Sequence, residues 1–296
     1  MKKLIFKLSL FLSLLICVII FSFLILSTVL SNKACFKLKK PVSALVLGNS
    51  HTEFALNDSI ITDIENVSQS GESYFYTYTK LKNILDDNPQ LKTVFLAFSN
   101  EVIDVGMNQW IWGDQFISFR FPKYSPFLDF QQHYVLGRNN PKSYFENLSK
   151  SIKYNSVKIF KNDYLMLKDN WGAFKNITQL EGKIEEYDTS SSEIKKVELS
   201  TDNLIYLDKI VELCEKNKIR LIFIRCPLHP KYQGYHNETI LKVILKNRYS
   251  TIRFLDFAKF QLDPTDYFDK EHLNQKGAQK FSIWFEKNKS IDFKIK

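Results

Sequence analysis

Cysteine and glycine are scarce in this sequence, and their placement excludes several kinds of protein. The 296-residue chain has four cysteines and nine glycines. Cys17, Cys35, Cys214 and Cys226 show no metal-binding spacing and no tight disulfide framework, so they are expected to be free, buried thiols. Whether Cys214 and Cys226 pair stays open at this point. No glycine-rich fingerprint follows the first predicted strand, which argues against a dinucleotide-binding protein.

The chain also lacks the charge pattern of a nucleic-acid-binding protein. Its formal net charge is +9, but lysines alternate with acidic residues and no nucleic-acid motif appears. A basic surface that faces anionic lipids or cell-wall polymers fits the charge better. The hydrophobic content of 45% is sufficient for a buried core.

One long stretch has no charge at all. Residues 8–30 are rich in Leu, Ile, Phe and Val, and as a helix they would extend roughly 35 Å, which is enough to cross a bilayer. The stretch is longer than the apolar part of a typical signal peptide, so an uncleaved membrane anchor is predicted. A cleaved signal and a lipoprotein remain alternatives, although Lys33 beside Cys35 makes a poor lipobox.

We expect the globular part on the extracytoplasmic side, with a short amino terminus inside. Lys2, Lys3 and Lys7 precede the apolar stretch and favour this orientation. Lysines on its other side, at positions 33, 37, 39 and 40, weaken the argument. Residues 1–40 are thus predicted to be the anchor and linker, and residues 41–296 one α/β domain.

Strands and helices are predicted to alternate in that domain. The expected helices are an amphipathic one from Tyr74 that ends at Asn88-Pro89, one around Leu204–Cys214 and one after Asn274. The expected strands are Val42–Leu47, Ile64–Val67, Val94–Phe98, Leu221–Ile224 and Ile252–Phe257. This alternation predicts a three-layer α/β/α fold with a central, mostly parallel, five-stranded sheet.

Regularity is lost between about residues 102 and 200. This part is rich in aromatic residues and broken by glycine and proline, and residues 185–193 are polar and serine-rich. We interpret it as an insertion of helices and loops. Its aromatic residues are expected to form core and lid packing, with sugar stacking or membrane contact as alternatives.

Polar residues follow several of the predicted strands. Ser50 follows the first, Gly71 the second and Asn100 the third, and Asp269 and His272 follow the fifth. Because active sites of parallel sheets gather at the carboxyl ends of the strands, these residues are expected to share one site.

A serine, a histidine and an acid can convert a hydroxyl group into a nucleophile. Ser50 would attack, His272 would take its proton, and Asp269 would orient the imidazole. The N–H groups of Ser50 and Gly71 and the Asn100 amide are candidates for the oxyanion hole. Taken alone, Ser50 would more often be a helix cap.

These motifs resemble those of the SGNH/GDSL hydrolase superfamily. Gly48-Asn49-Ser50-His51 is similar to its first block, Ser70-Gly71 to its glycine block, Asn100 to its asparagine block and Asp269-x-x-His272 to its last block. The residues of the first and last motifs are similar to those in membrane-anchored branches of the superfamily that transfer D-alanine or acetylate glycans. The sequence departs from the pattern at Asn49, which replaces an aspartate, and before Asn100, where a glycine is missing.

The resemblance implies acyl-ester hydrolysis or transfer through a metal-free triad, without a cofactor. The substrate would be an acylated glycan or cell-surface polymer, and membrane proteins of the envelope are possible partners. An alternative is a non-catalytic scaffold or binding component of a polysaccharide assembly machine. A distance between Ser50 Oγ and His272 well beyond about 4 Å would favour that alternative.

Overall fold

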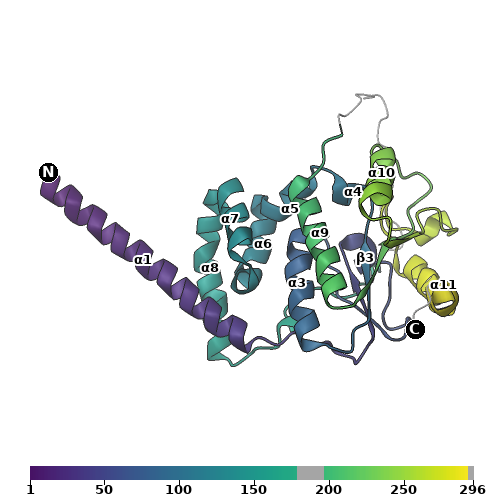
Figure 1. The fold of residues 1–296 in the computed structure, drawn as a ribbon, viewed down its shortest axis with the longest axis horizontal. Helices are drawn as coiled ribbons and strands as arrows, with labels where there is room; N and C mark the ends of the chain where they lie inside the picture. Colours follow the sequence, from purple (N-terminus) through teal and green to yellow (C-terminus); the bar gives the residue numbers. More distant parts are fainter. Residues whose placement is uncertain (179–196, 293–296) are drawn as a thin grey trace. The chain divides into compact units, whose positions relative to one another are not determined.

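The computed structural model of the protein describes residues 1–178 and 197–292 (Figure 1). It divides into two compact units, which are described separately here. Unit 1 comprises residues 1–36 and 112–166, and unit 2 comprises residues 37–111 and the described residues from 167 onward.

Unit 2 holds the sheet and most of the helices that pack on it. Its strands are β1 (Ala44–Leu47), β2 (Ile64–Asn66), β3 (Thr93–Ala97), β4 (Arg220–Arg225) and β5 (Arg253–Asp256). Its helices are α2 (Ser50–Glu53), α3 (Tyr74–Asp87), α4 (Asn100–Ile103), α5 (Met107–Trp112), α9 (Thr201–Lys216), α10 (Glu238–Arg248) and α11 (Gln275–Asp292), and it contains the 3₁₀ turn η3 (Pro264–Asp266). The last residue of α5, Trp112, and the first residue of the 3₁₀ turn η2 (Met166–Lys168) belong to unit 1.

The five strands pair in the order β2-β1-β3-β4-β5, and all the pairings are parallel. The chain runs outward from β1 in one direction to β2 and then returns to add β3 on the other side. The sheet therefore has a topological switch point between β1 and β3, where ligands of open α/β sheets bind. This architecture confirms the predicted α/β fold.

Alternate residues of the strands face opposite helical layers. Ala44, Val46 and Phe95 pack with Phe281 and Phe285 of α11 in one continuous core. The helices α3 and α9 pack on each other on the other side of the sheet (Figure 1). Because both faces are covered, β1 and β3 are buried along their whole length.

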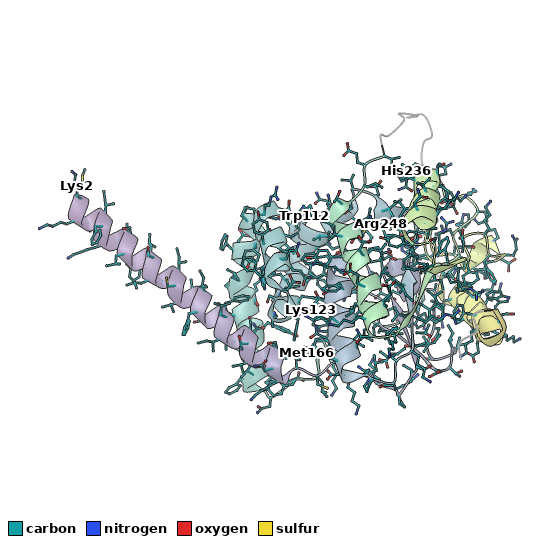
Figure 2. All side chains as sticks on the ribbon, in the orientation of Figure 1. Lys2, Trp112, Lys123, Met166, His236 and Arg248 are labelled. Atoms are coloured by element: carbon teal, nitrogen blue, oxygen red, sulfur yellow. The ribbon has the colours of Figure 1, made fainter. Side chains whose placement is uncertain are left out.

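Unit 1 is entirely helical. It contains α1 (Lys2–Lys33), α6 (Asp114–Tyr124), η1 (Ser125–Phe127), α7 (Phe130–Asn139) and α8 (Pro141–Phe160). Among the described residues, α1 is the helix that is long and apolar enough to cross a membrane. Figure 2 shows side chains projecting along α1 from Lys2 onward.

The region predicted as an insertion, about residues 102–200, divides between the two units. Its helices from α6 to α8 belong to unit 1, whereas α4 and nearly all of α5 belong to unit 2. The polar, serine-rich part of that prediction, residues 185–193, lies outside the described residues. Cys214 and Cys226 are both buried and free, as predicted, and do not form a disulfide bond. The prediction of burial is wrong for the other two, because Cys17 is exposed and Cys35 is only half-buried, although both are free.

Candidate active site

Ser50 lies at the turn between β1 and the short helix α2. Gly48 precedes it with φ at +150°, and a Cβ atom there would lie 2.3 Å from Cβ of Ala97. Only glycine fits this close approach to β3. Asn49 then caps α2, because its side-chain oxygen accepts the His51 N–H at 3.1 Å. The turn thus brings the Ser50 hydroxyl to the carboxyl end of β1.

His272 lies within hydrogen-bond distance of this hydroxyl. Its Nε2 is 2.8 Å from Ser50 Oγ, and its Nδ1 is 2.8 Å and 3.0 Å from the two carboxylate oxygens of Asp269. The structure therefore brings together the three residues predicted to form a triad. With Nδ1–H donating to Asp269, the free electron pair of Nε2 can accept the Ser50 proton.

Asp269 is held in its ionised form. Burial raises the pKa of its carboxyl group, but the hydrogen bond and the charge of His272, together with the backbone N–H groups of Glu271 and His272, outweigh burial. The pKa of Asp269 is therefore lower than usual. Both backbone N–H groups donate to Asp269 Oδ1, at 2.7 Å and 2.8 Å, and fix the loop in which His272 sits.

Asn274 fastens that loop to α11. Its side-chain oxygen accepts the Gly277 N–H at 3.1 Å, and its amide donates to the Thr265 carbonyl at 2.8 Å. A Cβ atom on Gly277 would lie 2.1 Å from the Asp266 carbonyl oxygen, so the helix can approach the loop this closely only at a glycine. The residues after His272 therefore have a structural role in positioning the imidazole.

Two predicted oxyanion donors are compatible with the geometry. The N–H groups of Ser50 and Gly71 donate to no other described residue. Glu53, one helical turn after Ser50, accepts hydrogen bonds from the backbone N–H and hydroxyl of Ser70, the former at 2.7 Å. Glu53 therefore ties the Ser70-Gly71 turn to the helix that begins with Ser50.

The structure does not bring the third candidate, Asn100, to Ser50. The Asn100 amide donates to Asn237 Oδ1 at 2.8 Å and to Glu238 Oε2 at 3.0 Å, and its oxygen accepts from Arg225 at 2.9 Å. The hydroxyl of Ser99, the residue before Asn100, donates to Glu101. Both side chains are thus bonded to neighbours in α4, at the end of β4 or at the start of α10.

One family model matches the chain, over residues 156–293. That family is uncharacterised. The match covers less than half of the chain and includes Asp269 and His272 but not Ser50. No curated protein matches the sequence.

His51, the residue after Ser50, is buried beside the triad. Its ring centroid is 5.3 Å from that of His272, and its Nε2 lies 3.6 Å from Glu101 Oε1 and 3.9 Å from Glu271 Oε2. His51, Glu271 and His272 offer ligand atoms within 4.8 Å of one another, so this group could hold a metal ion. A metal on Nε2 of His272 would take the electron pair that the triad needs.

Glu101 is a site residue that the sequence analysis did not single out. Burial raises the pKa of its carboxyl group, but the charge of His51 and hydrogen bonds from Ser99 and Asn49 lower it below the usual value. The Asn49 amide donates to Glu101 Oε1 at 2.9 Å. An ionised aspartate in place of Asn49 could not make this bond. The sequence feature that could have identified Glu101 is its position directly after Asn100, near the end of the third predicted strand.

Two adjoining pockets lie at the carboxyl ends of β4 and β5. One, of about 290 Å³, is lined by His229 and Phe260, and the other, of about 400 Å³, by Arg225 and Glu238; Tyr235 lines both. The His229 N–H donates to the carbonyl of Lys270, within the loop that carries Asp269 and His272.

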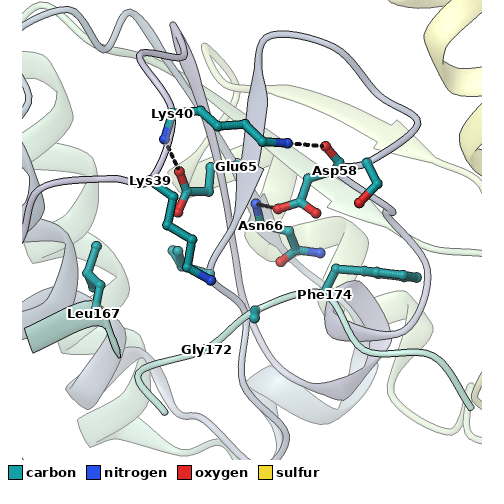
Figure 3. Close-up of a pocket in the computed structure, with 11 residues that line it drawn as sticks. Lys39, Lys40, Asp58, Glu65, Asn66, Leu167, Gly172 and Phe174 are labelled. Carbon is teal, nitrogen blue, oxygen red and sulfur yellow. Dashed lines mark hydrogen bonds between the residues drawn. The ribbon is translucent and has the colours of Figure 1, made fainter. Parts of the chain in front are cut away.

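A third pocket, of about 270 Å³, lies beside the edge strand β2 (Figure 3). Lys39, Glu65 and Phe174 are among its lining residues, and the backbone N–H of Lys40 donates to Glu65 at 3.2 Å. Burial raises the pKa of Glu65, against hydrogen bonds from the backbone of Lys40 and Lys39. No triad residue lines this pocket, so it is separate from the site at Ser50.

Proposed function

We propose that this protein is a serine esterase or O-acyltransferase that resembles the SGNH/GDSL hydrolases. The observation that carries the proposal is the continuous hydrogen-bonded chain from Ser50 Oγ through His272 to the Asp269 carboxylate. A distance between Ser50 Oγ and His272 well beyond about 4 Å would favour the alternative, a non-catalytic scaffold. The actual distance of 2.8 Å supports catalysis instead.

The first half-reaction forms an ester on Ser50. Ser50 Oγ attacks the carbonyl carbon of an acyl ester while its proton passes to His272 Nε2. The negative charge moves to the carbonyl oxygen, where the N–H groups of Ser50 and Gly71 are proposed to donate hydrogen bonds. When the intermediate collapses, the bond to the leaving alcohol breaks, and His272 returns the proton to that alcohol.

The second half-reaction releases the acyl group. Water, or a hydroxyl group of a glycan, attacks the Ser50 ester while His272 accepts its proton. Attack by water makes the protein an esterase, and attack by a glycan hydroxyl makes it a transferase. The outcome depends on whether the acceptor site excludes water.

We propose an acylated glycan or another cell-envelope polymer as the substrate. A chain with a membrane-spanning α1 would be held beside such polymers. Tyr235 lines both pockets beside the loop that carries His272. The pockets therefore offer an aromatic ring and several polar groups, a combination that suits a sugar. The proposed localisation is the extracytoplasmic side of the membrane.

The test is to label the detergent-solubilised full chain with a serine-directed fluorophosphonate. We expect an adduct on Ser50 by peptide mass spectrometry, absent from Ser50→Ala and strongly reduced in His272→Ala. Ser59→Ala, which removes a hydroxyl at the exposed Ser59, is the matched control and should label like the wild type. A folded wild-type protein that acquires no adduct would argue against the proposal.

A further inference from the structure

The helix α1 is longer than a bilayer requires. Its 32 residues would extend about 48 Å, whereas a hydrocarbon core of roughly 30 Å needs about 20 residues. About a third of the helix is therefore available for another role. The distribution of its buried side chains shows which third that is.

The carboxyl-terminal part of α1 belongs to the core of unit 1. Phe23, Ser27 and Leu30 are buried, and their spacing places them on one face of the helix. The Phe23 ring stacks on Phe121 at 6.4 Å, and Asn155 of α8 donates to Ser27 Oγ at 3.2 Å. The large apolar side chains between Leu4 and Phe21 are instead exposed.

We propose that α1 is retained as an anchor and that unit 1 rests directly on the membrane, with a lipid bilayer as its partner. Residues 4–22 would extend about 28 Å, which corresponds to one hydrocarbon core. Unit 1 begins to cover α1 at Phe23. No linker therefore separates the bilayer from the bundle.

Removal of α1 by a signal peptidase would leave unit 1 incomplete. Leu30 is fully buried, and the Asn155 side chain, also fully buried, donates its amide to Ser27. A cut near Cys35 would remove Phe23, Ser27 and Leu30, and would uncover the Phe121 ring and the Asn155 amide that Phe23 and Ser27 contact. Uncovered apolar and polar core groups of this kind are costly, which favours retention.

The contacts along α1 also show which end of the bundle lies toward the bilayer. Ser27 lies opposite Asn155 of α8, and Lys33 lies over the ring of Tyr164, which follows α8. Earlier residues of α8 thus lie toward the amino-terminal, lipid-exposed part of α1. Phe145, near the start of α8, is on the bilayer side, and Phe160, at its end, is on the side of Lys33.

The side chains at the bilayer end suit an interface. Phe145 is 64% exposed, and Tyr134 of α7, which follows the His133 that bonds Tyr144 Oη at 3.0 Å, is 56% exposed. The contacts of α1, not exposure, set the orientation, because Phe160 at the other end of α8 is 89% exposed. Arg138 and Lys142 are exposed beside the junction of α7 and α8. Aromatic rings at the level of the headgroups with neighbouring basic groups are typical of membrane-seated helices.

The experiment compares two phenylalanines on one helix. Phe145→Cys and Phe160→Cys are made in the full chain with Cys17→Ser and Cys35→Ser, since Cys214 and Cys226 are buried. An environment-sensitive fluorophore is attached, and the protein is reconstituted into phosphatidylethanolamine/phosphatidylglycerol vesicles. Leu12→Cys, within α1, serves as the control for insertion.

We expect spin-labelled lipid to quench the fluorophore at position 12 and at position 145 several-fold more than at position 160. The two positions on α8 are about 22 Å apart along the helix, which is sufficient to separate interface from water. Equal quenching at 145 and 160, no quenching at 12, or a native protein whose amino terminus begins after α1 would overturn the proposal. None of these outcomes depends on whether Ser50 is a nucleophile.

Discussion

Two polar clusters occupy the same edge of the sheet, but they are bonded in different ways. Ser50, His272 and Asp269 form a linear chain that ends in a partly exposed hydroxyl group. Arg225 instead binds Asn100, Glu238 and Asp256 at once and is itself buried. An open chain can pass a proton along its length, whereas the three guanidinium nitrogens of Arg225 are already bonded within the protein and hold the network together.

Under the proposed function, the linear chain carries the chemistry and the closed network contributes to stability. Substitutions in the linear chain should change reaction rate and leave folding nearly intact. Substitutions in the closed network should do the reverse. The following substitutions test whether the two clusters differ in this way.

The largest effect is expected for Asp269→Asn. The amide cannot stabilise the imidazolium or hold Nδ1–H toward itself as a carboxylate does, so the rate of Ser50 labelling should fall about 10³- to 10⁴-fold. The measurement is the fluorophosphonate labelling rate at neutral pH. The melting temperature should change little, and a variant that labels as fast as wild type would exclude Asp269 from the mechanism.

A large loss of stability is expected for Arg225→Met. The buried guanidinium compensates Glu238 and Asp256, and its loss should cost about 3 kcal/mol of unfolding free energy, measured by urea titration. Arg248→Met removes a more exposed pair with Asp208 and should cost less than about 1 kcal/mol. Similar losses in both variants would show that the closed network has no special structural importance.

Asn49→Asp tests the bond between the Asn49 amide and Glu101 at the turn that carries Ser50. The new carboxylate would face Glu101 in place of the amide that now donates to it, and stability should fall by about 2 kcal/mol at neutral pH. The double variant with Glu101→Gln should recover most of that loss. Without such recovery, the pairing of Asn49 with Glu101 would not explain the loss of stability.

The smallest effect concerns acid stability. Burial raises the pKa of Glu238, but hydrogen bonds from Arg225 and Asn100 outweigh it and lower the pKa from 4.5 to about 2. Because the folded pKa lies below the unfolded one, its stabilising contribution is complete above about pH 4.5 and is lost as the pH falls toward 2. Glu238→Gln should flatten the decline of unfolding free energy over this interval.

The control for that titration is Glu215→Gln, at an exposed position of α9. Its unfolding free energy should decline with falling pH as in the wild type. If Glu238→Gln also declines with the wild-type slope, the carboxylate of Glu238 does not contribute to acid stability.

The sheet and the catalytic candidates were predictable because their signals are local. The apolar run that becomes β1 ends at Gly48, and the spacing of Asp269 and His272 places both side chains in one loop. The helix α10 was missed, although Leu241, Ile244 and Leu245 recur at helical spacing and Asn237 precedes them.

Other features could not be predicted because they depend on distant contacts. The orientation of Asn100 is fixed by Arg225 and Glu238, more than a hundred residues away. The role of α1 in the core of unit 1 depends on Asn155 and Phe121 in the same way. No local pattern around Asn100 or Phe23 encodes these partners.

The most direct test of the central claim is to trap the acyl group on Ser50. The full chain is treated with an activated acetyl ester, quenched with acid and digested, and the acylated peptide is identified by mass spectrometry. The account predicts an ester on Ser50 in the wild type and in Asn100→Ala, and none in His272→Ala. An ester that is missing from the folded wild type, or that forms equally in His272→Ala, would contradict it.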